Sequence, residues 1–298
     1  MLWVFLQTGA HFLWAWTNVG DKYVVEKRIQ DPYVFTFLRW IFGILVIIII
    51  PFIDFYVIET KFLLLLAFTG FIYFYGAIPY VKALGMEEIS RVNVLWNFVP
   101  IFTFVIAWIF IDQKLYGFQL LAFFLLLFGS ILASIHITKG FFKLSKALFW
   151  MMFASVIYAT YATIFSYVTQ FVPFLLAFVW MTIFMLLSSV FLFFSKNFRS
   201  NLNQTFHHID SKLGLFLCAL SITDYVAVGI NIWALSLGPA ALVFAFEGMQ
   251  TIFVFSIAVL FSIFIPHILK EELDKKNVFL KIVALVLMLC AIIILAFH

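Results

Sequence analysis

Long apolar stretches alternate with short polar connections along the whole chain. Ten stretches are close to the ~20 residues that a helix needs to cross a ~30 Å hydrocarbon core. They cover residues 2–19, 33–53, 62–81, 92–111, 118–137, 147–168, 173–194, 213–237, 241–265 and 278–297. Polarity within them does not alternate at every second residue, as it does in the strands of a membrane β-barrel. The pattern predicts an all-α membrane protein with ten transmembrane helices.

The hydrophobic pattern also repeats within the chain. Residues 71–110 align without a gap to residues 222–261, at an offset of 151 positions. Five predicted helices lie in each half, and an odd number of crossings inserts the second copy the other way up. Chance matching in a Phe-, Leu- and Ile-rich sequence is the alternative, which the equal helix counts disfavour. We therefore expect two inverted five-helix repeats, residues 1–144 and 145–298, an architecture typical of secondary transporters.

Composition narrows the class of protein further. Charged residues make up 11% of the chain against about 25% in soluble domains. So few charges cannot cover the surface of a soluble fold, which indicates a membrane protein. The two cysteines, Cys218 and Cys290, lie in apolar stretches and indicate no disulfide framework. The sequence has no motif for zinc hydrolysis, serine acyl transfer or ATP binding. An enzyme is therefore not expected, and neither a cofactor nor a metal is predicted.

Lysine and arginine are distributed unevenly between the connections. Connections after odd-numbered helices carry 15 of them, whereas those after even-numbered helices carry only Lys61 and Lys114. Because positive charge favours the cytoplasmic side, this bias places both termini outside the cytoplasm. The most polar connection, Lys196–Lys212, contains His207, His208 and Asp210, and we interpret it as a solvated loop rather than a metal site.

A polar stripe follows the first predicted helix. Gln7, His11, Trp14 and Asn18 are spaced by four, three and four residues, which puts them on one helical face. We expect this face to point into the bundle. The side chains could then line a substrate pathway, or they could hydrogen-bond neighbouring helices.

Polar groups of the two repeats fall at matching depths. The offset of 151 pairs Tyr73 with Asp224, Tyr80 with Asn231, Trp96 with Glu247 and Asn97 with Gly248. Such convergence predicts a central cavity between the repeats, to which Tyr158 of the sixth helix also contributes. The candidate substrate-binding residues are His11, Trp14, Asn18, Tyr73, Trp96, Asn97, Tyr158, Asn231 and Gln250.

Two carboxylates within apolar stretches are candidates for coupling transport to protons. Burial disfavours the ionised form of Glu247 and Asp224, so either could bind and release a proton during a transport cycle. Glu247 is the first choice because Gln250, three residues away, shares its helical face and could hydrogen-bond it. Arg39 in the second helix could snorkel to the headgroups, neutralise a buried carboxylate or hold an anionic substrate, and a structural role is favoured. Pro100 predicts a kink in the fourth helix.

The chain resembles the EamA-domain family of the drug/metabolite transporter superfamily over almost its whole length. The resemblance rests on Arg39, the R-V-N-V-L-W-N-F-V-P-I-F run at 91–102, the A-L-S-L-G-P-A-A-L segment at 234–242, and Glu272-Leu273 before the last helix. It departs from the family at Gln113, where an acidic residue is usual, and in the ninth helix, which lacks the usual proline. The resemblance also implies termini in the cytoplasm, opposite to the charge bias.

The resemblance implies a gradient-driven exporter or exchanger of small metabolites such as amino acids or amines. A flippase for lipids or lipid-linked precursors is the alternative, and an intramembrane enzyme or receptor is less favoured. The expected partners are a small-molecule substrate and membrane lipids, without nucleic acid, and the chain is expected to act as a monomer. We expect it to lie in the cell membrane of a prokaryote.

Overall fold

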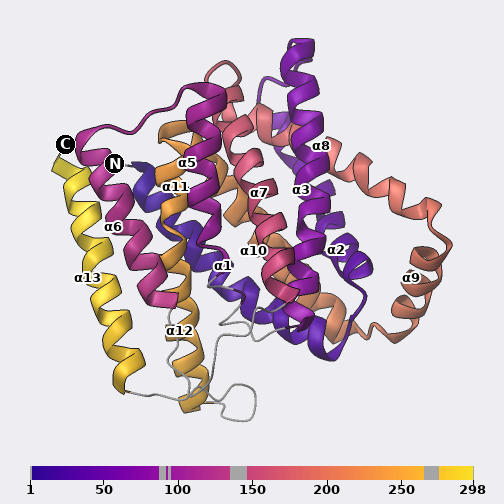
Figure 1. The fold of residues 1–298 in the computed structure, drawn as a ribbon. Coiled ribbons are helices and arrows are strands. Elements are labelled where there is room, and N and C mark those ends of the chain that lie inside the picture. Colours follow the sequence, from indigo (N-terminus) through magenta and orange to yellow (C-terminus); the bar gives the residue numbers. More distant parts are fainter. Residues whose placement is uncertain (1, 87–91, 93–94, 135–145, 265–274, 298) are drawn as a thin grey trace.

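The computed structural model describes residues 2–86, 92, 95–134, 146–264 and 275–297, and these residues are helical apart from short connections. Figure 1 shows a bundle whose two termini lie at the same end. The first half contains α1 (Leu2–Lys27), α2 (Pro32–Trp40) continued by the 3-10 helix η1 (Ile41–Phe52), α3 (Thr60–Met86), α5 (Phe98–Ile111) and α6 (Gly117–Ser134). The second contains α7 (Lys146–Val168), α8 (Phe174–Ser189) with η2 (Val190–Phe194), α9 (Lys196–His208), α10 (Ser211–Leu237), α11 (Ala240–Ala245), α12 (Glu247–Phe264) and α13 (Lys275–Phe297).

Six segments of the described chain are long and apolar enough to cross a membrane: Pro32–Phe52, Thr60–Met86, Lys146–Val168, Phe174–Phe194, Ser211–Leu237 and Ala240–Ile257. Three shorter apolar helices accompany them, Phe98–Ile111, Gly117–Leu132 and Ile282–Leu295. The chain is therefore an integral, multi-pass membrane protein. The expected boundary between the repeats near residue 144, and the Glu272-Leu273 pair, lie outside the described residues.

The first helix is longer than its apolar stretch predicts. α1 continues beyond residue 19 to Lys27, so Asp21 and Lys22 are helical and do not belong to a connection. Asp21 is buried, and the Lys22 ammonium donates to the Leu84 carbonyl oxygen at 2.8 Å. The helix tolerates these charges because each meets a partner inside the bundle. α2 then begins at Pro32, where the Asp31 carboxylate accepts from the amides of Tyr33 and Val34.

The segment interpreted as a solvated loop is largely a helix, so that expectation was wrong. α9 starts after Ser195, whose hydroxyl accepts from the Phe198 amide, and it lies at the periphery of the bundle (Figure 1). Phe198 and Leu202, four residues apart, are buried against the bundle, while His207 and His208 are exposed. Packing of this apolar face against the bundle stabilises the helix, although the polar composition of the segment is typical of a loop.

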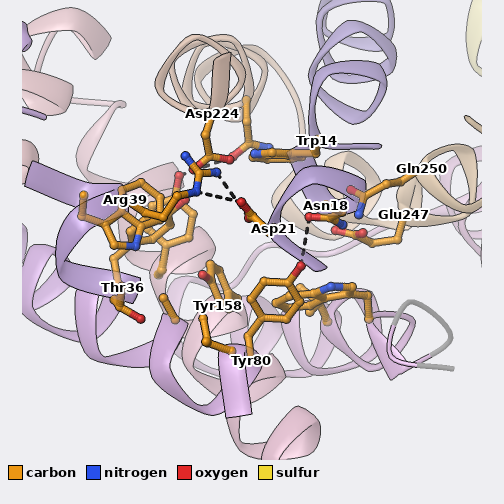
Figure 2. A pocket seen from close by; sticks show the side chains of 18 of the residues that line it. Trp14, Asn18, Asp21, Thr36, Arg39, Tyr80, Tyr158, Asp224, Glu247 and Gln250 are labelled. Atoms are coloured by element: carbon orange, nitrogen blue, oxygen red, sulfur yellow. Dashed lines mark hydrogen bonds and ion pairs between the residues drawn. The ribbon is translucent and has the colours of Figure 1, made fainter. Parts of the chain in front are cut away.

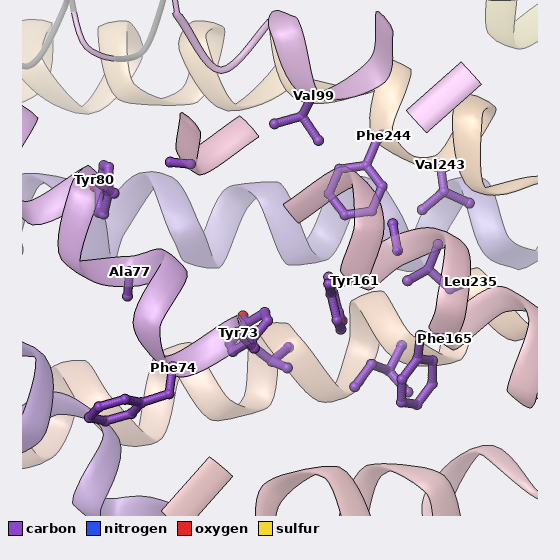
Figure 3. Packing of buried hydrophobic residues seen from close by; sticks show 14 of the residues in the cluster. Tyr73, Phe74, Ala77, Tyr80, Val99, Tyr161, Phe165, Leu235, Val243 and Phe244 are labelled. Carbon is purple, nitrogen blue, oxygen red and sulfur yellow. The ribbon is translucent and has the colours of Figure 1, made fainter. Parts of the chain in front are cut away.

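Helix pairs in the two halves pack in matched couples. α3 packs on α7, and α10, which the offset of 151 aligns with α3, packs on α1. In the same way α5 packs on α7, and α12, which the same offset aligns with α5, packs on α1. The last helices of the two halves, α6 and α13, pack on each other. The buried side chains between these helices form one large apolar core, part of which Figure 3 shows around Phe74, Phe165 and Leu235.

Candidate functional site

A cavity of about 90 Å³ lies within the bundle and is walled by both halves of the chain (Figure 2). It is smaller than the ~300–1,000 Å³ of typical ligand pockets, so this conformation suits a small, compact ligand. No lining residue is exposed at the protein surface. The lining side chains come from α1, α2, α3, α5 with the turn before it, α7, α10, α11 and α12: Trp14, Asn18, Asp21, Phe35, Thr36, Arg39, Trp40, Tyr73, Ala77, Tyr80, Val81, Trp96, Val99, Tyr158, Tyr161, Asp224, Asn231, Phe244, Glu247 and Gln250.

Aromatic rings form a continuous wall along this cavity. The ring centroids of Tyr80 and Trp96 lie 5.1 Å apart, and those of Trp96 and Tyr158 also lie 5.1 Å apart. Tyr158 meets Tyr73 at 5.3 Å, and Tyr73 meets Trp40 at 5.2 Å. Most of these contacts are edge-to-face, which suits the quadrupoles of the rings and fixes their orientation. The wall therefore presents rigid π-surfaces to a ligand.

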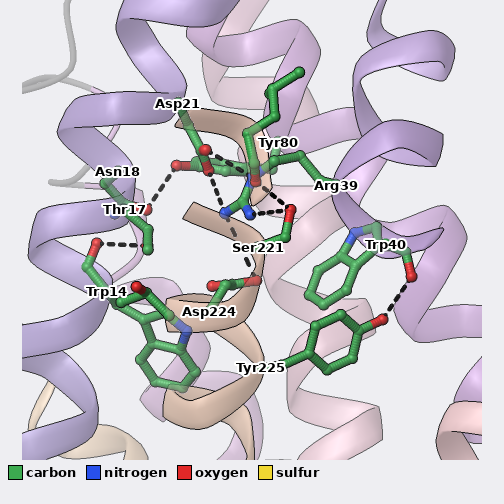
Figure 4. A network of polar contacts seen from close by, with 12 residues as sticks. Trp14, Thr17, Asn18, Asp21, Arg39, Trp40, Tyr80, Ser221, Asp224 and Tyr225 are labelled. Carbon is green, nitrogen blue, oxygen red and sulfur yellow. Dashed lines mark hydrogen bonds and ion pairs between the residues drawn. The ribbon is translucent and has the colours of Figure 1, made fainter. Parts of the chain in front are cut away.

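Arg39 is the centre of a buried charge cluster (Figure 4). Its Nε and Nη2 donate to the two carboxylate oxygens of Asp21, at 2.8 and 3.3 Å, and its Nη1 donates to the Ser221 hydroxyl at 3.0 Å. Asp224 lies 3.9 Å from Nη2, on the cavity wall that it shares with Trp14. The guanidinium thus neutralises a buried carboxylate, the second of the three roles considered for it.

Asp21 is the charged wall residue that the sequence reasoning missed. It lies three residues after Asn18, so it continues the stripe of Gln7, His11, Trp14 and Asn18 along the same face of α1. The signal was present in the sequence, but the apolar stretch ended before it. Trp40, which also lines the cavity, carried no comparable signal, whereas Tyr161 lies three residues after Tyr158 on the same face of α7.

Glu247 has a different environment from the other carboxylates. It is 7% exposed and lines the cavity, but no described residue forms a hydrogen bond or an ion pair with its carboxylate. The expected hydrogen bond from Gln250 is not formed, because the Gln250 Oε1 accepts from His11 instead. Arg39 is committed to Asp21 and therefore does not lock Glu247.

A chain of hydrogen bonds runs behind the cavity through four helices. The Tyr161 hydroxyl donates to Asn231 Oδ1 at 3.3 Å, and Asn231 Nδ2 donates to Gln7 Oε1 at 2.9 Å. Gln7 Nε2, which can only donate, lies 2.9 Å from His11 Nε2, so that ring nitrogen accepts. The ring proton therefore sits on His11 Nδ1, which donates to Gln250 Oε1 at 3.2 Å. His11 is thereby held neutral, and all four hydrogen bonds run in the same donor-to-acceptor direction, from Tyr161 to Gln250.

Two helices are interrupted beside the cavity, at positions that the offset of 151 relates within two residues. In the fourth predicted helix, Trp96 and Asn97 form a turn before α5. Pro100 lacks the N–H that would bond to the Trp96 carbonyl, which accepts from the Val99 amide at 2.9 Å instead. The kink expected at Pro100 thus lies one turn earlier. In the ninth helix, Phe246 separates α11 from α12.

Ser130 of α6 explains the second interruption. Its hydroxyl accepts from the Gly248 amide at 2.8 Å and donates to the Ala245 carbonyl at 3.2 Å, so a side chain is inserted into the backbone ladder. A Cβ at Gly248 would overlap the side chains of Ser130 and Met288. The Ser130 carbonyl also accepts from Asn97 Nδ2 at 3.4 Å. One residue therefore joins both interruptions.

Most of the candidate residues converge on the cavity, but two do not. Trp14, Asn18, Tyr73, Trp96, Tyr158, Asn231, Gln250, Asp224 and Glu247 all line it, together with Arg39. His11 lies behind Gln250, where its hydrogen bonds bury it. Asn97 turns towards Ser130. The repeat-related pairs Tyr73/Asp224, Tyr80/Asn231 and Trp96/Glu247 thus share the cavity, whereas Asn97 and Gly248 share Ser130.

The first half of the chain is similar to a known protein family. Residues 1–135 match the EamA-like transporter family. The match confirms the resemblance to that family over the first half of the chain. Among curated proteins, none matches the chain.

The fold also occurs in solved structures. Matches extend to 28 chains, among them a crystal structure with a TM-score of 0.64 and 13% sequence identity. That alignment covers 96% of this chain and 94% of the other. At this identity the likeness concerns the fold alone, and it extends over both halves of the chain.

Proposed function

We propose that this protein is a secondary transporter that moves a small metabolite, such as an amine or an amino acid, by alternating access. The central cavity is then its substrate site, and the two halves of the chain rock about it. The observation that carries the proposal is the cavity itself, because polar and aromatic groups of both halves meet there inside an otherwise apolar bundle.

Two further features support inverted repeats that rock about the cavity. The matched packing couples, α3–α7 with α10–α1 and α5–α7 with α12–α1, are what a pseudo-two-fold axis between the halves produces. Interrupted helices at related positions beside a midplane site recur in secondary transporters, where unwound backbone contacts the substrate or the coupling ion. The turns at Trp96–Asn97 and Phe246 supply such interruptions.

The cavity also separates transport of a soluble metabolite from lipid flipping. A flippase needs a polar groove that opens between helices towards the lipid. Here every residue that lines the cavity is buried or half-buried, so the described wall shows no polar groove exposed at the outer face of the bundle. The geometry therefore favours a small polar substrate, and we assign the direction as export or exchange, as the family resemblance implies.

Glu247 is the proposed coupling residue. A carboxylate without a partner in the described structure, facing a cavity, can take up a proton when the cavity faces one side and release it on the other. Asp224 is the second choice, because it already lies 3.9 Å from a guanidinium nitrogen. In this scheme Arg39 and Asp21 hold α1 and α2 together and do not change protonation.

The first experiment is an untargeted metabolite screen of membrane vesicles with and without the protein. A transporter depletes or enriches particular solutes in the vesicles that contain it. The screen then supplies a substrate for flux measurements with Glu247→Gln and with Glu59→Gln, a control at an exposed glutamate outside the cavity. We expect Glu247→Gln to abolish proton-driven uptake while exchange at saturating substrate continues. Unchanged gradient-driven uptake in that variant would remove Glu247 from the coupling role.

A further inference from the structure

The charges of the cavity are unbalanced. Asp21, Asp224 and Glu247 contribute three carboxyl groups to the wall, and Arg39 contributes the one cationic group among the lining residues. Arg39 is already shared by Asp21 and, at longer range, Asp224. The described wall thus has carboxylate to spare and no spare cation.

We infer that the cavity selects small organic amines that carry a positive charge and no carboxylate. The inference rests on the proposed transport function and assigns its substrate class. Glu247 is the counter-charge for the ammonium group, because it is the buried carboxylate on the wall that has no partner among the described residues. Burying an unpaired carboxylate is costly, and a cationic ligand relieves that cost.

The aromatic wall provides the second part of an amine site. Tyr80, Trp96 and Tyr158 lie in contact along one side of the cavity, and Figure 2 shows Tyr80 and Tyr158 facing the same space as Glu247. Cations bind to the faces of such rings within ~6 Å of the centroid, and tryptophan is the best of them. An aryl or alkyl chain on the amine would pack against the remaining rings.

The state of Arg39 disfavours a ligand carboxylate. Three of its five N–H groups already donate, two to Asp21 and one to Ser221, and Asp224 lies 3.9 Å from Nη2. A ligand carboxylate would therefore compete with Asp21 and Asp224 for the same guanidinium. It would also enter a cavity that holds Asp224 and Glu247. The ammonium group of a zwitterionic amino acid is attracted by Glu247, but its carboxylate is repelled by the acidic wall and weakens its binding. A simple amine has the attraction without the repulsion.

The test measures binding to the purified full-length protein by calorimetry with three probes that differ only in their charged groups. Phenethylamine is cationic, 3-phenylpropionate is anionic, and phenylalanine is zwitterionic. We expect phenethylamine to bind most tightly. In Glu247→Gln its affinity should fall about 30-fold or more, as for a buried charge pair that loses one partner. Glu247→Asp keeps the charge and should give an intermediate affinity, and Glu59→Gln should leave it unchanged.

Probe selectivity in the unaltered protein decides the matter even where a variant fails to fold. Absence of phenethylamine binding, or equal or tighter binding of phenylalanine or 3-phenylpropionate, overturns the amine inference. Retained affinity in a folded Glu247→Gln variant overturns the role of Glu247. In either case flux of another solute in the vesicle screen would leave the transport proposal standing, whereas absence of any flux would sink that proposal separately.

Discussion

The bidentate contact between Asp21 and Arg39 should dominate the stability of the charge cluster. Both side chains are at least nine-tenths buried, and two hydrogen bonds of 2.8 and 3.3 Å join them. Removing one partner of a buried ion pair costs about 3–5 kcal/mol, because the other charge is left uncompensated. In Asp21→Asn the amide oxygen keeps one acceptor and Asp224 remains nearby, so we expect the lower end, about 3 kcal/mol.

Asp224→Asn is the matched comparison. Its carboxylate is 3.9 Å from Arg39 Nη2, beyond hydrogen-bonding distance, so its removal should cost less than that of Asp21. The double variant Asp21→Asn with Arg39→Gln removes both charges of the close pair. It should recover at least half of the loss of Asp21→Asn, because neither side of that contact then carries an uncompensated charge.

The assay is the midpoint of thermal unfolding in one detergent, followed by the monodisperse fraction on size exclusion. A loss of ~3 kcal/mol corresponds to a fall of about 6 °C or more at ~2 °C per kcal/mol. The reasoning is refuted if Asp224→Asn lowers the midpoint as much as Asp21→Asn. It is equally refuted if the double variant is less stable than either single one.

Three further predictions concern other parts of the chain. If the charge bias sets the orientation, α9 lies on the cytoplasmic side. A cysteine at the exposed Asn203, in a background without Cys218 and Cys290, should then resist a membrane-impermeant thiol reagent in intact cells. Ready labelling would place α9 outside the cytoplasm. Gly248→Ala should lower stability by about 1–3 kcal/mol, because the added methyl group overpacks against Ser130 and Met288. Gly9→Ala, where nothing lies within 4 Å of the added methyl group, should cause no measurable loss. Equal unfolding midpoints for the two variants would contradict the close contact at Gly248. Gln113→Ala should lower stability by about 1 kcal/mol, because the Gln113 Oε1 accepts from the first amide of α11 at 2.9 Å. Gln113→Glu keeps an acceptor at the start of that helix and should leave stability unchanged. The same unfolding assay checks this order of the two variants.

Much of the fold could be predicted from the sequence because apolar length and helical spacing are local properties. Each predicted apolar stretch falls on described helix, wholly or in part, and the repeat offset alone points to Tyr73, Trp96, Asp224 and Glu247, which all line the cavity. Where the prediction failed, tertiary contacts decided the outcome. α1 continues through Asp21 because Arg39 of another helix neutralises it, and α9 forms because the bundle covers Phe198.

The finer arrangement of the site depended on contacts between residues that are distant in the chain. Ser130 gave no signal in the sequence, because a lone serine in an apolar helix usually bonds within its own helix. Here its hydroxyl enters the backbone of the ninth helix. Which groups His11 would contact was equally open, since its position on the stripe says that it faces inward but not whether it meets ligand or protein.

The row of hydrogen bonds from Tyr161 to Gln250 aligns the bond dipoles along the back wall of the cavity. Tyr161 belongs to α7, Asn231 to α10, Gln7 and His11 to α1, and Gln250 to α12. Asn231, Gln7 and His11 each accept one bond of the row and donate the next, so none of these three can turn round without breaking two bonds. A group in the cavity that reversed Gln250 would oblige His11 to exchange the roles of its two nitrogens and Gln7 and Asn231 to turn with it. The wall thus has two self-consistent polarities, and four helices would register the change without any backbone having to move.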